Sequence, residues 1–134
     1  MSEQRLLWER DLRFTGIDSW GHLVDIDGDP EGEGAKPSDL LPLALAACTA
    51  YDIVTILRKQ RQDLQGLEAS IQCTQDDEAP WIFRAIRVVY TARGDVDETK
   101  ARKALDLSEQ KYCAISATLR PAVRLEFAIN VQRS

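Results

Sequence analysis

The sequence has one histidine, His22, and only three cysteines in 134 residues. No two cysteines form a Cys-x-x-Cys pair, and no cysteine lies close to the histidine in the sequence. Zinc sites are built from clustered Cys and His ligands, so this pattern argues against a zinc centre. We expect no bound metal and no other cofactor. An odd number of cysteines is consistent with thiols that stay reduced inside the cell.

The sequence also has no excess of positive charge. It contains 17 Lys and Arg residues against 22 Asp and Glu residues, which gives a formal net charge of −5. A nucleic-acid surface needs a concentrated basic patch. The short basic cluster at residues 58–61 is more typical of a solvated helix end. We therefore expect no nucleic-acid partner.

The first residues, Met1 to Arg5, lack the apolar region of a signal peptide, so the sequence predicts a cytoplasmic location. One long apolar run, residues 40–57, approaches the length of a transmembrane helix. Its single charge, Asp52, and its proline, Pro42, argue against that interpretation, because a carboxylate in mid-bilayer is costly. We expect no membrane association.

The composition, 44% hydrophobic and 29% charged, allows one globular domain over residues 1–134. Hydrophobic periodicity predicts helices from Ser38 or Asp39 to about Gln60, over 96–111, and from Cys113 to a point before Pro121. It predicts strands over 5–15, 19–27, 67–74, 81–92 and 123–131. The resulting order, ββ-α-ββ-α-β, predicts an α+β fold with an antiparallel sheet and a long central helix.

The helix predicted over 38–60 has apolar residues on almost every side. At ~1.5 Å per residue it is about 33 Å long, roughly the diameter of a domain of this size. One small sheet cannot cover such a helix all round. This pattern favours a homodimer that buries the helix from both subunits.

The three cysteines stand in different local patterns. Cys73 alternates with polar residues in a predicted strand and is interpreted as a small buried hydrophobic residue. Cys48 shares a narrow polar stripe with Tyr51, Asp52 and Thr55 on an otherwise apolar helix. This polar stripe is consistent with a reactive pocket. It is also consistent with a core cysteine beside an aspartate that anchors a strand.

Cys113 lies near the start of a short predicted helix, where the helix dipole favours a thiolate. The alternative is a buried cysteine at a helix junction. A thiol peroxidase needs a thiolate that becomes a sulfenic acid and a second thiol that condenses with it to a disulfide. The 65 positions between Cys48 and Cys113 neither predict nor forbid such a pairing.

Five segments, spread over nearly the whole chain, have distinctive sequences: PSDLL at 37–41, AACTAYDIV at 46–54, RKQRQD at 58–63, APWIF at 79–83 and DLSEQKYC at 106–113. Together they resemble the OsmC/Ohr family of thiol-dependent peroxidases, and within it the OsmC-like subgroup. The resemblance implies an intertwined homodimer, with central helices between two sheets and active sites at the subunit interface.

The resemblance also implies that Cys48 is the peroxidatic thiol and Cys113 the resolving thiol. The substrates would be organic hydroperoxides, reduced in defence against oxidative stress. The electrons would come from a dithiol, such as protein-bound dihydrolipoamide.

Two departures from the family pattern concern the groups that support the thiolate. Family members carry a glutamate shortly before the first cysteine, where this chain has Asp39, which has a shorter reach. They also use an arginine from the N-terminal region, for which Arg13 and Arg10 are the candidates here. Asp52 is a further candidate. Two other functions stay open for the same dimer, namely non-catalytic binding of a small ligand and redox sensing.

Overall fold

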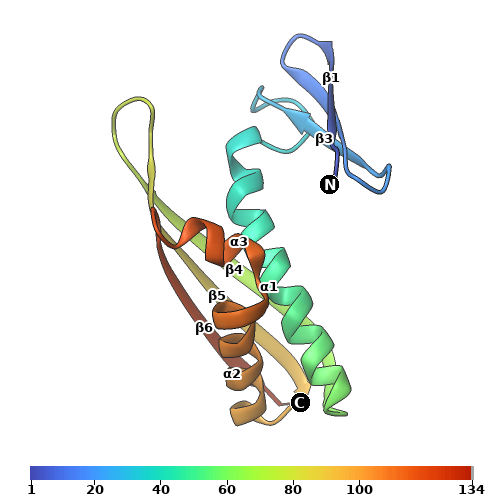
Figure 1. Cartoon of the computed structure of the whole chain (residues 1–134), viewed down its shortest axis with the longest axis vertical. Coiled ribbons are helices and arrows are strands. Elements are labelled where there is room, and N and C mark those ends of the chain that lie inside the picture. Colours follow the sequence, from blue (N-terminus) through green and yellow to red (C-terminus); the bar gives the residue numbers. More distant parts are fainter. Residues whose placement is uncertain (134) are drawn as a thin grey trace. The chain divides into compact units, whose positions relative to one another are not determined.

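A computed structural model describes residues 1–133 of the chain (Figure 1). The chain divides into two compact units, residues 1–41 and the remainder from Pro42 onward. Each unit contains its own three-stranded sheet, and the helices lie between strands in the sequence. The α+β class is confirmed, while the single domain over residues 1–134 stays a prediction.

The first unit contains an antiparallel sheet in the order β1 (Arg5–Arg10), β2 (Arg13–Ile17) and β3 (Leu23–Asp27). The prediction of one strand over 5–15 is wrong, because the chain reverses at Asp11, which has a φ of 44°. A turn at Asp18 separates β2 from β3. The Asp18 carboxylate accepts hydrogen bonds from the backbone N–H groups of Trp20 (2.9 Å) and His22 (2.8 Å), so β3 begins only at Leu23.

The glycine-rich segment after β3 folds back beside that strand. Ala35 N–H donates to the Asp25 carbonyl, and Asp27 N–H donates to the Ala35 carbonyl, both at 2.9 Å. Gly34 lies so close to β3 that a Cβ there would come within 2.6 Å of the Ile26 carbonyl carbon. A side chain at this position would therefore push the segment away from β3. A short 3₁₀ helix, η1 (Pro37–Asp39), follows.

The second unit is built on the sheet β4 (Asp63–Gln75), β5 (Phe83–Asp95) and β6 (Arg124–Gln132). β4 and β5 form an antiparallel hairpin, but β5 and β6 are parallel. The prediction of an antiparallel sheet is therefore wrong for this last pair. The chain between β5 and β6 contains α2 (Glu98–Leu107), the π-helical turn η2 (Ser108–Tyr112) and α3 (Ala114–Leu119). This crossover is long enough to return the chain to the same end of the sheet.

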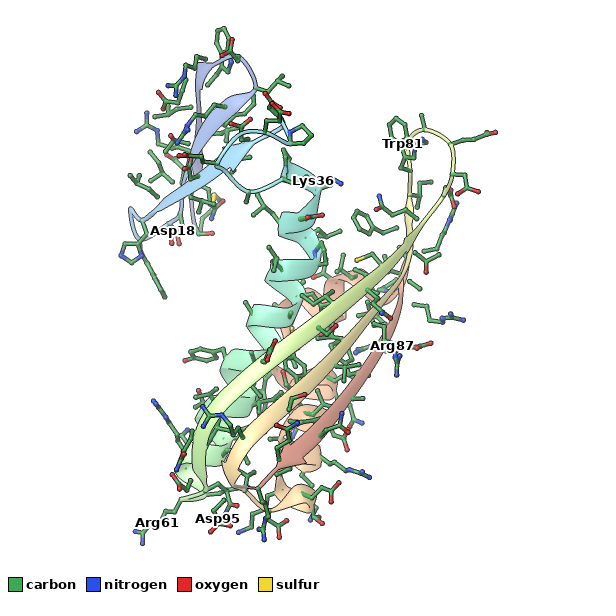
Figure 2. The ribbon with its side chains drawn as sticks, turned by 180° about the vertical axis from the view of Figure 1, so that it is seen from behind. Asp18, Lys36, Arg61, Trp81, Arg87 and Asp95 are labelled. Carbon is green, nitrogen blue, oxygen red and sulfur yellow. The ribbon has the colours of Figure 1, made fainter. Side chains whose placement is uncertain are left out.

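The helices of the second unit cover one face of its sheet, as the opposite views of Figures 1 and 2 show. The long helix α1 (Leu40–Lys59) packs there, and its end agrees with the prediction. Along β5 and β6, the more buried residues alternate with more exposed ones. The core of this unit is apolar and comprises Leu45, Ala46, Ile53, Leu57, Ile86, Val88, Tyr90, Ala92, Val96, Ala101, Ala104, Leu105, Val123 and Ile129. The Tyr90 hydroxyl donates to the Ala46 carbonyl at 2.7 Å and so links β5 to α1.

α1 presents only part of its apolar surface to this core. Leu45, Ile53 and Leu57 are fully buried, whereas Leu43 is 49% and Tyr51 71% exposed. By length and hydropathy alone, the helical segment Pro37–Lys59 passes the test for a membrane span. Because one side of α1 packs against the sheet, we describe it as a partly buried core helix.

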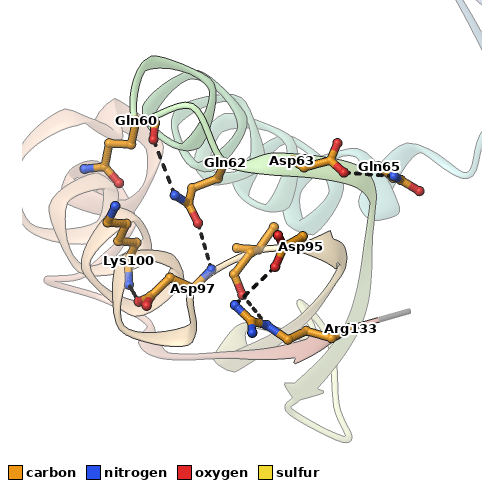
Figure 3. A network of polar contacts seen from close by, with 9 residues as sticks. Gln60, Gln62, Asp63, Gln65, Asp95, Asp97, Lys100 and Arg133 are labelled. Atoms are coloured by element: carbon orange, nitrogen blue, oxygen red, sulfur yellow. Dashed lines mark hydrogen bonds and ion pairs between the residues drawn. The ribbon is translucent and has the colours of Figure 1, made fainter.

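A polar network joins the end of α1 to the ends of the strands (Figure 3). The Gln62 side chain donates to the Gln60 carbonyl and accepts from Asp97 N–H at 2.8 Å. The Asp97 carboxylate in turn accepts from Lys100 N–H at 3.0 Å and caps α2. Arg133 contacts Asp95 at 3.3 Å. These contacts fix where α2 begins relative to α1.

Cys73 differs from its predicted environment, because it is exposed rather than buried. It pairs in register with the buried Ile86 on β5, so its side chain lies on the expected face of the sheet. However, β4 is an edge strand of this sheet. Alternation predicts the face on which a side chain lies, but not whether another element covers it.

Candidate functional site

Cys48 and Cys113, 65 positions apart in the sequence, lie close enough in the second unit for each thiol to influence the pKa of the other. Cys48 is half-buried in the middle of α1. Cys113 lies between η2 and α3, and only 3% of its surface is exposed. The fold thus places one partly accessible thiol directly against a buried one.

The backbone around Cys113 fixes the position of its sulfur. Cys113 N–H donates to the Ser108 carbonyl at 2.8 Å, which closes the π-helical turn η2. The residue then adopts an extended conformation (φ −83°, ψ 105°), which ends that turn and starts α3. Its Sγ accepts a hydrogen bond from Ser116 N–H at 3.3 Å, as an N-cap side chain does. The short helix predicted to begin at Cys113 is confirmed.

Asp52 joins η2 to α1. Its carboxylate accepts a 2.6 Å hydrogen bond from the hydroxyl of Ser108, which is fully buried. A carboxylate taken partly out of water needs such a partner. This bond holds the segment before Cys113 against the helix that bears Cys48.

The two thiols have different electrostatic environments. Burial raises the pKa of Cys48, and the hydrogen bond to Cys113 and the negative charges of Cys113 and Asp52 act in the same direction. Burial alone would also raise the pKa of Cys113. There, the hydrogen bond from Ser116 N–H and the neighbouring polar groups of Ser116, Thr49 and Cys48 outweigh burial and lower the pKa below its ordinary value. At Cys48, a hydrogen bond from the Ile115 backbone N–H acts in the opposite direction and lowers the pKa without cancelling the rise.

Two hydroxyl groups complete the surroundings of Cys113. Thr49 and Ser116 are fully buried, and neither hydroxyl makes a well-formed hydrogen bond to another described group. Both lie beside the Cys113 sulfur closely enough to lower the pKa of that thiol. Sequence reasoning missed both residues. Thr49 lies next to Cys48 but off the polar stripe, and only the Cys-x-x-Ser spacing at an expected N-cap could have indicated Ser116.

The sequence pattern of the family described as "OsmC-like protein" matches residues 28–128. This chain belongs to the OsmC-like protein family. It is 31% identical to Protein YhfA of Escherichia coli K12 over 130 residues, covering 96% of this chain and 97% of YhfA.

Solved structures agree with this membership. A hypothetical protein from Aquifex aeolicus VF5 superposes with a TM-score of 0.88 at 25% identity, over 100% of this chain and 98% of the other. The organic hydroperoxide resistance protein OhrB of Bacillus subtilis superposes with a TM-score of 0.65 at 17% identity, over 97% and 98% of the two chains. The likeness to OhrB shows the fold alone.

The remaining predicted site residues of this OsmC-like protein have other surroundings. Arg13 forms an ion pair with Asp25 at 2.9 Å, Arg10 is exposed at the end of β1, and Asp39 is exposed in η1. The negative charge of Asp52 raises the pKa of Cys48, and its role as a thiolate-supporting group stays a prediction. Tyr51 of the predicted polar stripe is 71% exposed in the chain. Among residues 1–133, no cluster of His, Cys, Asp and Glu side chains is arranged to hold a metal ion.

Proposed function

We propose that this OsmC-like protein reduces organic hydroperoxides with Cys48 and Cys113. The observation that carries the proposal is the contact between the two thiols, which come from separate elements of the fold. Two cysteines in contact can form a disulfide without large movement of the backbone. The name of the OhrB relative, an organic hydroperoxide resistance protein, points to the same substrate class.

Accessibility decides which thiol meets the peroxide. Cys48 is half-buried, while Cys113 is 3% exposed, so a peroxide reaches the Cys48 sulfur first. The Cys48 thiolate attacks the distal peroxide oxygen, the O–O bond breaks, and the alkoxide leaves and takes up a proton as the alcohol. Cys113 then attacks the Cys48 sulfenic acid, and the disulfide forms with release of water.

An external dithiol then returns two electrons and two protons to the disulfide by thiol–disulfide exchange. A lipoyl-type dithiol is the reductant that we propose for this step. Asp39 and one of the arginines, Arg10 or Arg13, are the proposed charges around the attacking thiolate. The leading influences on the pKa of Cys48 in the described chain include no positive charge. The proposed reaction therefore needs a positively charged group near this thiol to stabilise its thiolate.

The active protein is proposed to be a homodimer. Large apolar side chains are exposed on both units, among them Trp8, Trp20 and Leu23 in the first and Leu43 in the second. A second copy of the chain supplies the apolar surface that would remove them from water.

The test is to add one equivalent of cumene hydroperoxide to the fully reduced protein, quench by alkylation, and map the thiols by mass spectrometry. We expect rapid loss of Cys48 and Cys113 together, with a peptide pair joined by a disulfide and Cys73 still alkylated. The Cys113→Ser variant should stop at a Cys48 sulfenic acid, and Cys48→Ser should not turn over.

Three alkylatable thiols after several minutes would contradict the proposal and favour the binding of a small ligand. A disulfide that forms but is not reset by dihydrolipoamide or dithiothreitol would favour redox sensing instead.

A further inference from the structure

The tip of the β4–β5 hairpin, residues 76–82, presents large apolar side chains to water. Trp81 is 58% and Ile82 43% exposed. Trp81 has a φ of 53°, a left-handed conformation that is costly for a bulky side chain. Two hydrogen bonds hold it there: Trp81 N–H donates to the Glu78 carbonyl at 2.8 Å, and the Gln75 side chain donates to the Trp81 carbonyl at 3.0 Å. The hairpin tip is therefore an ordered surface with an exposed aromatic ring.

The hairpin tip also carries unbalanced negative charge. Asp76 is neutralised by its ion pair with Arg84 at 2.8 Å. Asp77 and Glu78 are exposed, and neither forms an ion pair within residues 1–133. An apolar surface beside two free carboxylates suits a partner that offers apolar contacts and positive charge together.

Positive charge gathers where α1 ends, in a basic cluster of Arg58, Lys59 and Arg61. All three are exposed, and none forms an ion pair in the part of the chain that the structure describes. Figure 2 shows Arg61 and Trp81 at opposite ends of the second unit. The strand β4, which runs between them, is roughly 40 Å long. The hairpin tip and the basic cluster therefore cannot meet within one chain.

The exposed side of α1 ends in this basic cluster. Leu43, Ala47 and Tyr51 are exposed at intervals of four residues, and Arg58 continues the same side seven residues later. From Leu43 to Arg58 this side is about 22 Å long at 1.5 Å per residue. It offers an apolar surface with positive charge at one end, which is the combination that suits the hairpin tip.

We propose that a second copy of this chain covers the exposed side of α1 and that its hairpin tip binds the basic cluster. A two-fold axis perpendicular to α1 reverses one second unit relative to the other, so each hairpin tip comes to the basic cluster of the other copy. Asp77 and Glu78 then face opposite charges, and the Trp81 ring is available to an arginine for a cation–π contact. This inference rests on the homodimer of the proposed function, and it names the surfaces that meet.

Because each copy supplies both surfaces, exchanging the charges tests the contact. The tip variant is Asp77→Lys with Glu78→Lys, and the cluster variant is Arg58→Glu with Arg61→Glu. Either variant alone places like charges in contact at both ends of its homodimer, so sedimentation equilibrium should show association weakened on the order of a hundredfold. An equimolar mixture of the two variants should restore the double mass, because each tip then meets a cluster of opposite charge.

Lys100→Glu with Lys103→Glu is the matched control for the cluster variant. It makes the same change in net charge at exposed positions of α2 and should leave the dimer as tight as in the wild type.

Trp81→Ala tests the aromatic part of the contact without any change in charge. It should weaken association on the order of tenfold, because buried aromatic side chains dominate the binding energy of many interfaces. Trp81→Phe keeps a ring and should weaken association less. Far-ultraviolet circular dichroism of every variant should match the wild type.

Tip, cluster and Trp81→Ala variants that associate as tightly as the wild type would overturn this contact and leave the homodimer standing. A mixture of the tip and cluster variants that stays at the single mass would also overturn it. A wild-type protein that sediments at the single mass would overturn the homodimer and this contact together. Because sedimentation uses no peroxide, these results do not depend on the proposed peroxidase activity.

Discussion

At the residue scale, Asp52 has two opposed effects on the thiol pair. It accepts the 2.6 Å hydrogen bond from Ser108 that holds η2 against α1, and so it helps to place Cys113 beside Cys48. The same negative charge raises the pKa of Cys48 and makes that thiol a slower nucleophile at neutral pH. The geometry of the pair and the reactivity of Cys48 therefore depend on this carboxylate in opposite ways.

Replacing Asp52 by Asn should separate these two effects. The amide oxygen can still accept from Ser108, but the charge is gone, so the pKa of Cys48 should fall. We expect iodoacetamide to label Cys48 about threefold faster at pH 7.5, as followed by mass spectrometry. Ser108→Ala is the control, because it removes the hydrogen bond and keeps the charge. Unchanged or slower labelling of Cys48 in Asp52→Asn would contradict this account.

The sequence pointed to both cysteines of the site but not to the groups around them. The segments near Cys48 and Cys113 are distinctive in sequence, whereas their contact depends on how α1 and the end of η2 pack. Thr49 and Ser116 are ordinary residues in the sequence, and their complete burial is evident only in the structure. The periodicity of hydrophobic residues along one helix or strand carries no information about a contact between distant elements.

At the scale of elements, the β4–β5 hairpin is joined near its tip by one ion pair. Arg84 donates two hydrogen bonds to the Asp76 carboxylate, at 2.9 and 2.8 Å, and Figure 2 shows Trp81 in the loop beyond it. These hydrogen bonds hold the pKa of Asp76 below its ordinary value of 3.8. The folded hairpin thus favours the ionised form of Asp76.

We expect Arg84→Gln to raise the pKa of Asp76 towards 3.8, as measured by NMR titration of its carboxyl carbon. Because the folded pKa is the lower one, the pair stabilises the hairpin above pH 3.8, and that contribution is lost as the pH falls through the folded value. Arg87→Gln is the matched control, since Arg87 lies on the same strand and faces Glu126 at 4.0 Å. An Asp76 pKa that does not respond to Arg84→Gln would show that the ion pair does not persist in solution.

The elements show clearly where sequence periodicity succeeds and where it fails. The periodicity of hydrophobic residues predicted β5 and β6, and the long apolar run predicted α1. Both predictions succeed because burial of one face requires apolar residues at regular positions in the sequence. The reversal at Asp11 was missed because hydrophobic residues alternate on both sides of it. The parallel pairing of β5 and β6 was missed because it depends on the path of the crossover, which no strand pattern records.

At the scale of the whole molecule, the distribution of apolar surface is the feature that points beyond one chain. α1 buries Leu45, Ile53 and Leu57 against its own sheet and leaves Leu43 and Tyr51 in solvent. The strands and turns of the first unit expose large apolar side chains as well: Leu6, Trp8, Leu12, Trp20 and Leu23. Extensive exposed apolar surface marks places where proteins associate. The α+β fold and the family were predictable from the sequence, while the homodimer stays a prediction.

Substitution of Leu43 by Glu tests the homodimer directly. Leu43 is 49% exposed on the side of α1 that its own sheet leaves uncovered, so in the single chain the charge would lie in water at little cost. In a dimer that buries this side, the same charge would be desolvated without a partner and should weaken association by several kcal/mol. Sedimentation equilibrium should therefore give twice the chain mass of 15.1 kDa for the wild type and a shift towards the single mass for Leu43→Glu.

Leu107→Glu makes the same chemical change at a comparably exposed residue of α2, 39% exposed, and should leave the dimer intact. Far-ultraviolet circular dichroism of Leu43→Glu should show retained secondary structure, because α1 still packs against its sheet through Leu45, Ile53 and Leu57. A wild-type protein that sediments at the single mass at tens of micromolar would rule out the homodimer. A Leu43→Glu dimer as tight as the wild type would instead place the subunit contact away from this side of α1.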